Sequence, residues 1–280
     1  MKRNSFSIAL LAAGMSLGFL NATTVAGTLT LLDQNSSVTI DPYGQDGVNS
    51  WMVDGQNQLS QQWFWYRTGE TGAASPIDTL GNAMVSGTNA NTYAATLSYS
   101  STNIGLSIQT KFGLTGVPSP GGQSNLTETI TITNTSPGAQ TIDFFQYSNF
   151  VLQGGSDGNT ITFPDVNDVQ QSNGVSSLSE TTVNPSSTYY EANSPSNLLG
   201  EITGAGFGHL ANLTTGPVQS PFQAADVAWA YEWDLSIPAG QSRIISKDLQ
   251  LEVVPEPSTL ALLLSAGLGL IGWAWRRRRV

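Results

Sequence analysis

Apolar and polar side chains alternate with a period of two along most of residues 28–253. The alternation is clearest in residues 227–237, where Val, Trp, Tyr, Trp, Leu and Ile occupy every second position. Successive side chains of a β-strand point to opposite faces of the sheet, so this pattern is typical of a strand with one buried face. The same alternation recurs in four other segments: 93–99, 104–114, 126–133 and 249–253.

Helical patterns are weak in the same part of the chain, and Gly, Pro, Asn and Ser separate the strand-like runs. About 225 residues are enough for one sizeable core. Because the chain has no cysteine, packing rather than disulfide bonds must stabilise it. We therefore predict an all-β fold, an antiparallel two-sheet β-sandwich formed by residues 28–253.

Two local arrangements follow from the turn residues. Residues 134–138 separate the strand-like runs 126–133 and 141–152, which we expect to pair as a hairpin or meander. The Ser- and Asn-rich stretch 167–197 shows little periodicity, and we expect long loops there with one or two short strands.

The predicted sandwich is strongly acidic. It holds nineteen Asp and Glu but four Lys and Arg, a net charge of −15, whereas the whole chain has a net charge of −10. Nucleic-acid binding depends on Lys and Arg contacts to phosphates, so a nucleic-acid partner is excluded. The acidity favours solubility, and neutral glycans or cations as partners.

The N-terminus has the three parts of a secretory signal peptide. Lys2 and Arg3 precede an apolar run at 6–20, and small residues at 24–26 form a cleavage site. We assign residues 1–27 to an N-terminal signal helix that is recognised by the Sec machinery and removed by signal peptidase.

The C-terminus carries a second tripartite segment. Pro255, Glu256 and Pro257 form an extended peptide, because both prolines fix their own backbone angles and restrict the residues before them. Residues 259–275 carry no charge and approach the length of a transmembrane helix. A basic stop completes the segment: Arg276, Arg277, Arg278 and Arg279.

Residues 254–280 resemble the PEP-CTERM sorting signal of Gram-negative bacteria. The resemblance rests on the order of Pro255-Glu256-Pro257, the apolar helix and the arginine cluster at the end of the chain. It implies processing by an exosortase, transient residence in the inner membrane, and delivery to the cell surface or extracellular matrix. It also implies an association with exopolysaccharide, and it describes the route of the protein rather than its biochemistry.

The densest aromatic run holds the candidate glycan-binding residues. Trp63 and Trp65 share one face of a predicted strand and could stack on sugar rings, while Arg67 could bond to hydroxyl groups. The alternative is a strand buried on both faces, which the sequence favours because large aromatic side chains usually fill cores. Burial of the two tryptophans decides between the two interpretations.

Glu232 and Asp234 are candidates for a glycosidase pair, since they share one strand face about 6 to 7 Å apart. With nineteen acidic residues such pairs arise by chance, so a solvated strand face is the preferred interpretation. His209 is the only histidine, and no G-x-S-x-G motif accompanies it, so we expect an isolated polar residue there and no catalytic site.

No cofactor is predicted, and one His without Cys argues against a zinc site. A calcium site is a weak candidate at Asp157, Asp165 and Asp168, which lie in oxygen-rich segments that do not match an EF-hand loop. Ordinary turn chemistry is the preferred interpretation of these residues.

These features together predict an exported, non-enzymatic surface protein with a structural or adhesive role linked to exopolysaccharide. Two alternatives stay open: a carbohydrate-binding module that uses the Trp63–Arg67 segment, and a secreted glycan-active hydrolase.

Overall fold

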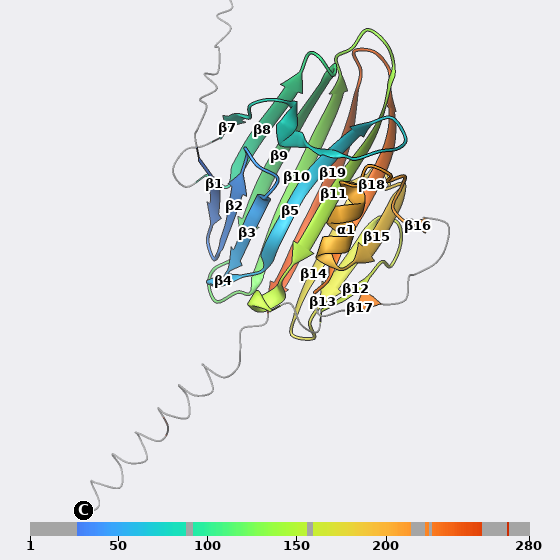
Figure 1. Ribbon diagram of the computed structural model, residues 1–280. Helices are drawn as coiled ribbons and strands as arrows, with labels where there is room; N and C mark the ends of the chain where they lie inside the picture. The colour runs from blue at the N-terminus through green and yellow to red at the C-terminus, as the bar shows by residue number, and fades with distance from the viewer. Residues whose placement is uncertain are drawn as a thin grey trace, which may run out of the picture.

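The computed structural model describes residues 27–87, 92–155, 159–213, 222–223, 226–253 and 268. Two large β-sheets pack face to face (Figure 1), as the alternating sequence predicts. The predicted signal helix lies outside these residues apart from Gly27, and so does the apolar segment 259–275 apart from Leu268. Among the described helices, none is long and apolar enough to cross a membrane.

The first sheet has ten strands. Its main path runs β1-β2-β3-β5-β11-β18-β15-β16, with β4 paired to β3 and β6 paired to β5. Its strands are β1 (Leu29–Asp33), β2 (Ser36–Asp41), β3 (Gly47–Val53), β4 (Gln56–Asn57), β5 (Leu59–Thr68), β6 (Ser75–Pro76), β11 (Gln140–Phe150), β15 (Tyr189–Asn193), β16 (Asn212–Leu213) and β18 (Ala228–Ile237). All described pairings are antiparallel except a short parallel contact between β3 and β5.

The second sheet has nine strands in the order β17-β12-β13-β14-β19-β10-β9-β8-β7. They are β7 (Met84–Ser86), β8 (Ala94–Ser101), β9 (Leu106–Gly116), β10 (Gln123–Asn134), β12 (Thr160–Thr162), β13 (Asp168–Ser172), β14 (Ser176–Asn184), β17 (Phe222–Gln223) and β19 (Ser242–Val253). Alternate residues of β8, β9 and β10 are buried, as the two-residue period predicts.

The centre of the ten-stranded sheet is covered on both faces. The helix α1 (Pro195–Ile202) contacts β18, β15 and β11 on the outer face (Figure 1). The 3-10 helix η1 (Ile77–Leu80) contacts β5 and β6 of this sheet and also β8 and β9 of the nine-stranded sheet. A further 3-10 turn, η2 (Leu152–Gly154), follows β11. As a result nine consecutive residues of β11 are buried, so burial does not alternate along this strand as it does along β8, β9 and β10.

Two local expectations were wrong. The runs 126–133 and 141–152 do not pair, since β10 belongs to the nine-stranded sheet and β11 to the ten-stranded sheet. The connection crosses between the sheets, and buried Asn134 holds it by donating hydrogen bonds to the carbonyls of Gly138 and Ile237. The stretch 167–197 forms three strands rather than long loops.

The sandwich contains an ionic centre between its sheets. Lys247 lies 2.5 Å from Oε2 of its cross-strand neighbour Glu128 and 3.7 Å from Oε1 of Glu180. It also donates a hydrogen bond to Gln146 of the facing sheet, and its ammonium lies 4.9 Å from the centre of the Phe64 ring. Glu180 points inward from β14, so the buried face of this strand is partly polar. The sequence of β14 therefore lacks the apolar alternation that identifies the other strands.

Candidate active site

Two rows of side chains cross the outer face of the ten-stranded sheet at its middle strands. Asp143 of β11 is the cross-strand partner of Arg67 on β5 and of Asp234 on β18. One step along, Glu232 of β18 is the partner of Tyr189 on β15. The antiparallel register therefore places one arginine and three carboxylates from three neighbouring strands side by side.

His209 reaches this face from the loop that follows α1. Its Nδ1 lies 2.7 Å from Oε1 of Glu232 and 3.9 Å from Oδ1 of Asp234. The other oxygen of Glu232 accepts the backbone N–H of Leu210, so one carboxylate fixes both the imidazole and the adjacent backbone. The Tyr189 ring stacks on the imidazole with 4.8 Å between ring centres.

Arg67 holds the loops around the site. Its guanidinium donates to Oδ2 of Asp143, with a shortest distance of 2.6 Å, and lies 3.8 Å from Glu232. The same guanidinium also donates to five backbone carbonyls of the surrounding loops, those of Gly69, Glu70, Gly72, Phe207 and Gly208. Every guanidinium nitrogen is thus committed to the protein itself, while the 207–208 segment that precedes His209 is fixed.

Exposure differs sharply among the four acidic and imidazole side chains. Asp143 and Glu232 are buried, whereas the side chains of His209 and Asp234 are about one-third exposed, at 33% and 30%. A ligand can therefore reach His209 and Asp234. Buried Asp143 and Glu232 influence a ligand only indirectly, through their effect on the charge and position of those two side chains.

The environment shifts the protonation of all four groups. Burial raises the pKa of Glu232 to about 7, although the Leu210 N–H and His209 oppose the shift. Burial lowers the pKa of His209, but the hydrogen bond and charge of Glu232, with Asp234 and Asp143, raise it above its ordinary value overall. The pKa of Asp234 is raised by burial and then by the charge of Asp143. Burial likewise raises the pKa of Asp143 against the opposing effect of Arg67.

Such a set can move protons near neutral pH. Glu232 and His209 titrate as a coupled pair that shares protons, and Asp234 offers a second exposed proton-transfer group. Within the described residues, the ligating atoms of Asp143, His209, Glu232 and Asp234 all lie within 4.8 Å of one another, as a metal site requires. Because Arg67 already places a positive charge among them, we interpret the cluster as a proton-transfer site rather than a metal centre.

The predicted glycan platform is absent from this structure. Trp63 and Trp65 are fully buried, and Arg67 is 4% exposed. Trp63 donates its indole N–H to Asp78, and Trp65 packs edge-on against Tyr147, so neither ring is available for sugar stacking. The interpretation of a strand buried on both faces is the correct one.

The preferred interpretation of Glu232, by contrast, was wrong, and that of His209 was incomplete. Glu232 does not lie on a solvated strand face but is fully buried, and His209 is not an isolated polar residue but its hydrogen-bond partner. Asp143 was missed altogether. A pattern search could find Glu232 and Asp234 as an i, i+2 pair, but the contributions of Asp143 and His209 depend on strand order and on a loop 23 residues away from Glu232.

Two of the three weak calcium candidates lie in the described part of the chain, and they do not belong to a cluster of potential ligands there. Asp157 lies outside the described residues. Asp165 accepts the backbone N–H of Asn167 in a local turn, and neither Asp165 nor Asp168 belongs to the described cluster of potential ligands.

Comparison with known proteins identifies the C-terminal segment and the fold separately. Residues 253–279 match the PEP-CTERM protein-sorting motif, which confirms the resemblance seen in the sequence and is limited to that segment. The motif implies recognition by an exosortase, export, and membrane-anchored processing before release at the surface. No curated protein matches the chain significantly.

Three solved structures illustrate the fold. A galactose mutarotase-like protein from Lactobacillus casei is 8% identical with a TM-score of 0.54, and the match covers 81% of this chain and 100% of that one. An aldose epimerase homologue from C. elegans is also 8% identical, with a TM-score of 0.51 and coverage of 82% and 99%. A bacterial glucoamylase complexed with acarbose is 10% identical with a TM-score of 0.55, and the match covers 89% of this chain and 37% of that chain.

At these identities the likeness shows the fold alone. It nevertheless corrects the expectation of a non-enzymatic protein, because the fold is one that aldose epimerase and glycoside hydrolase structures share, so enzymatic carbohydrate chemistry is not excluded. The comparisons do not bear on the expected structural or adhesive role.

Proposed function

We propose that the protein is an exported carbohydrate-active enzyme that interconverts the anomers of a free aldose at the His209–Glu232–Asp234 site. The observation that carries this proposal is the 2.7 Å contact between Glu232 and His209, next to the exposed carboxylate of Asp234. The fold shared with an aldose epimerase homologue supports the substrate class.

Anomer interconversion needs one base and one acid and no net change in protons. Asp234 takes the proton of the anomeric hydroxyl, while His209 gives a proton to the ring oxygen through Nε2, and the bond between C1 and the ring oxygen breaks. Rotation of the aldehyde about its bond to C2 and the reverse transfers close the ring as the other anomer. Both protons then return to their original groups.

Glu232 prepares His209 for this role. It holds Nδ1 and leaves Nε2 as the nitrogen available to a ligand. Its negative charge stabilises the imidazolium, so the acid is protonated at a higher pH than an isolated histidine. Asp143 contributes to the same field, and Arg67 limits the repulsion among the carboxylates.

Hydrolysis of a glycosidic bond is less well supported. Retaining glycosidases separate their carboxyl groups by about 5 to 5.5 Å and inverting ones by about 6.5 to 9.5 Å. Here the two carboxylates of β18 that could form such a pair differ in access, because Glu232 is fully buried while Asp234 is exposed. Proton transfer on a small sugar suits the compact arrangement better.

The termini suggest where this activity operates. We infer that the Sec machinery and signal peptidase remove residues 1–27, and that an exosortase acts near Pro255-Glu256-Pro257 while residues 259–275 lie in the inner membrane. The enzyme then acts at the cell surface or in the extracellular matrix of a Gram-negative bacterium, where exopolysaccharide is a source of sugars.

Anomer exchange of freshly dissolved α-D-glucose and α-D-galactose tests the proposal. The full chain, purified in detergent, should accelerate the exchange measured by proton NMR at the anomeric positions. H209Q and D234N should lower the acceleration by about 100-fold or more, whereas T115A on the exposed face of β9 should not change it. Equal rates with and without the wild-type protein would exclude this function.

A further inference from the structure

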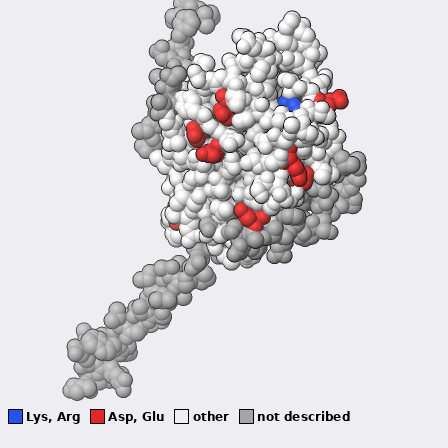
Figure 2. Space-filling view, viewed as in Figure 1, with Lys and Arg blue, Asp and Glu red and all other residues white. Residues whose placement is uncertain are grey.

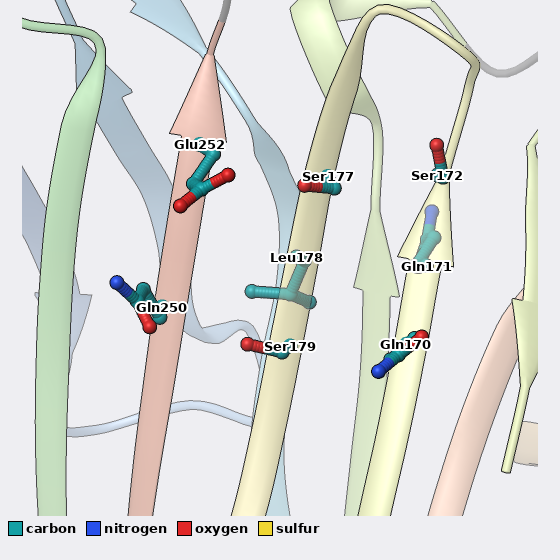
Figure 3. Close-up of a pocket in the computed structure, with 8 residues that line it drawn as sticks. All are labelled: Gln170, Gln171, Ser172, Ser177, Leu178, Ser179, Gln250 and Glu252. Carbon is teal, nitrogen blue, oxygen red and sulfur yellow. The ribbon is translucent and has the colours of Figure 1, made fainter. Parts of the chain in front are cut away.

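A hollow lies on the other side of the sandwich from the His209 site, on the outer face of the nine-stranded sheet. It has a volume of about 280 Å³ and is lined by residues of β13, β14 and β19, three neighbouring strands (Figure 3). The Asp143–His209–Glu232–Asp234 site belongs to the other sheet, so the two features share no residue.

Side-chain length explains why a sheet face is hollow here. Ser177 and Ser179 of the middle strand β14 are short, whereas Gln170 on β13 and Gln250 and Glu252 on β19 are long. The register aligns them across the strands, with Gln170 opposite Ser179 and Ser179 opposite Gln250. The result is a trough with a serine floor and amide and carboxylate walls, running along β14.

The polar groups of the trough are not used by the protein. Within the described residues, the side chains of Gln170, Ser177, Ser179, Gln250 and Glu252 have no hydrogen-bond partner among the contacts of the fold, although Ser172 bonds within its own turn. Glutamine amides both donate and accept hydrogen bonds, and serine hydroxyls do the same. The trough therefore presents a mixed array of donors and acceptors.

Charge and polarity define the ligand. The lining holds one carboxylate and no Lys or Arg, so a phosphorylated or uronic-acid ligand has no cation to bind. Its exposed side chains are polar, so a lipid or an apolar peptide gains little there. A hollow of this size, near the lower end of the range of about 300 to 1,000 Å³ for small-molecule pockets, fits a short stretch of a larger ligand.

We propose that this trough, lined by Gln170, Ser177, Ser179, Gln250 and Glu252, binds a neutral polysaccharide chain. It is a binding surface without chemistry of its own, and it does not depend on the proposed anomer exchange. Its hydroxyl-rich ligand matches the free amide, hydroxyl and carboxylate groups of the walls and floor.

Affinity electrophoresis of the full chain in detergent tests the trough, with dextran, laminarin and galactomannan as neutral probes and alginate as the anionic one. At least one neutral probe should retard the wild-type protein more than alginate does. S179Y, which fills the floor, should weaken that retardation by about tenfold or more. T115Y puts the same side chain on exposed β9 of the same sheet and should bind like the wild type.

Further variants distinguish loss of binding at the trough from misfolding and from effects at the His209 site. Q250A removes one wall without adding bulk and should also weaken binding, while circular dichroism verifies that each variant is folded. H209Q should bind the polysaccharide normally, whatever its effect on anomer exchange. No retardation by any neutral probe, equal retardation of S179Y and T115Y, stronger retardation by alginate, or loss of binding in H209Q would each overturn the proposal.

Discussion

Glu232 and His209 come from a central strand and a distant loop, yet Oε1 of one lies 2.7 Å from Nδ1 of the other. The pair lies on an acidic molecule, and the face seen in Figure 2 shows scattered Asp and Glu with little Lys or Arg. In this environment a histidine holds its proton more tightly, and the buried carboxylate loses part of its acidity.

The single histidine makes this coupling measurable. In the wild-type protein, the pKa of His209 measured by NMR titration of its ring protons should lie above the ordinary value of about 6.5. E232Q removes the negative charge that raises the pKa of His209, so the midpoint should fall. D234N should lower it less, because Asp234 is a more distant partner at 3.9 Å. An unchanged midpoint in E232Q would show that the contact does not control the imidazole.

The ionic centre should make stability depend on pH. Burial raises the pKa of Glu180 to about 7 against the opposing charge of Lys247, while an unfolded glutamate titrates near 4.5. The native state therefore binds the proton more tightly than the unfolded state. The free energy of unfolding should fall as pH rises from about 4.5 to 7 and then level off, with a loss on the order of 3 kcal/mol.

Urea denaturation at a series of pH values checks this dependence. E180Q cannot titrate, so the fall between pH 4.5 and 7 should be smaller than in the wild type. E252Q, on the exposed face of β19, should leave the pH dependence unchanged. If the free energy of unfolding instead rose over this interval, Glu180 would not bind its proton more tightly in the native state than in the unfolded state.

Removal of Arg67 should be costly. R67A leaves buried Asp143 without its ion-pair partner and removes the guanidinium donor from five loop carbonyls, so we expect a loss of about 3 to 5 kcal/mol in the free energy of unfolding. R243A removes an exposed arginine from β19 and should change it by no more than about 0.5 kcal/mol. Similar losses in the two variants would contradict the organising role of Arg67.

Gly47 is required by the side chain beside it. A Cβ at this position would lie 2.2 Å from a ring atom of Trp63, and the backbone φ of +52° also disfavours other residues. G47A should therefore lower the free energy of unfolding by about 1 to 3 kcal/mol beyond backbone strain alone. G55A provides that reference, because Gly55 has a φ of +82° but open space around it. Chemical denaturation should rank G55A as the milder change.

Processing at the C-terminus can be tested separately. P255A/P257A removes both prolines of the sorting motif, so an exosortase-bearing host should accumulate the unprocessed, membrane-bound chain. Immunoblotting of membrane and surface fractions measures the outcome. Equal release of wild type and variant would show that the Pro-Glu-Pro motif is not needed.

The sequence predicted the sheets better than it predicted the site. The two-residue period identified strands such as β9 and β19 because their polar faces meet solvent. It failed at β14, where Glu180 and Thr182 point inward and the buried face is polar. It also could not tell that β10 and β11 belong to different sheets, since a turn sequence does not specify which strand a neighbour pairs with.

The candidate site was hidden for a related reason. Asp143, Glu232 and His209 are far apart in the chain, and the pairing of β11 with β18 brings the two carboxylates together. Short-range patterns grouped Trp63 and Trp65 with Arg67 as a candidate surface, whereas the register pairs Arg67 with Asp143 of β11. Burial of the two tryptophans was the favoured interpretation, but the segments that cover Arg67, among them the 207–208 loop, could not be identified from short-range patterns.

The ionic centre also determines how the two sheets are aligned. Lys247 bonds to Glu128 within its own sheet and to Gln146 of the opposite sheet, so the contact joins both layers at one point. If either sheet slipped by one residue, the ammonium would face hydrocarbon instead of its partners, at a cost of several kcal/mol. We infer that these few charged side chains favour one alignment of the two sheets over others.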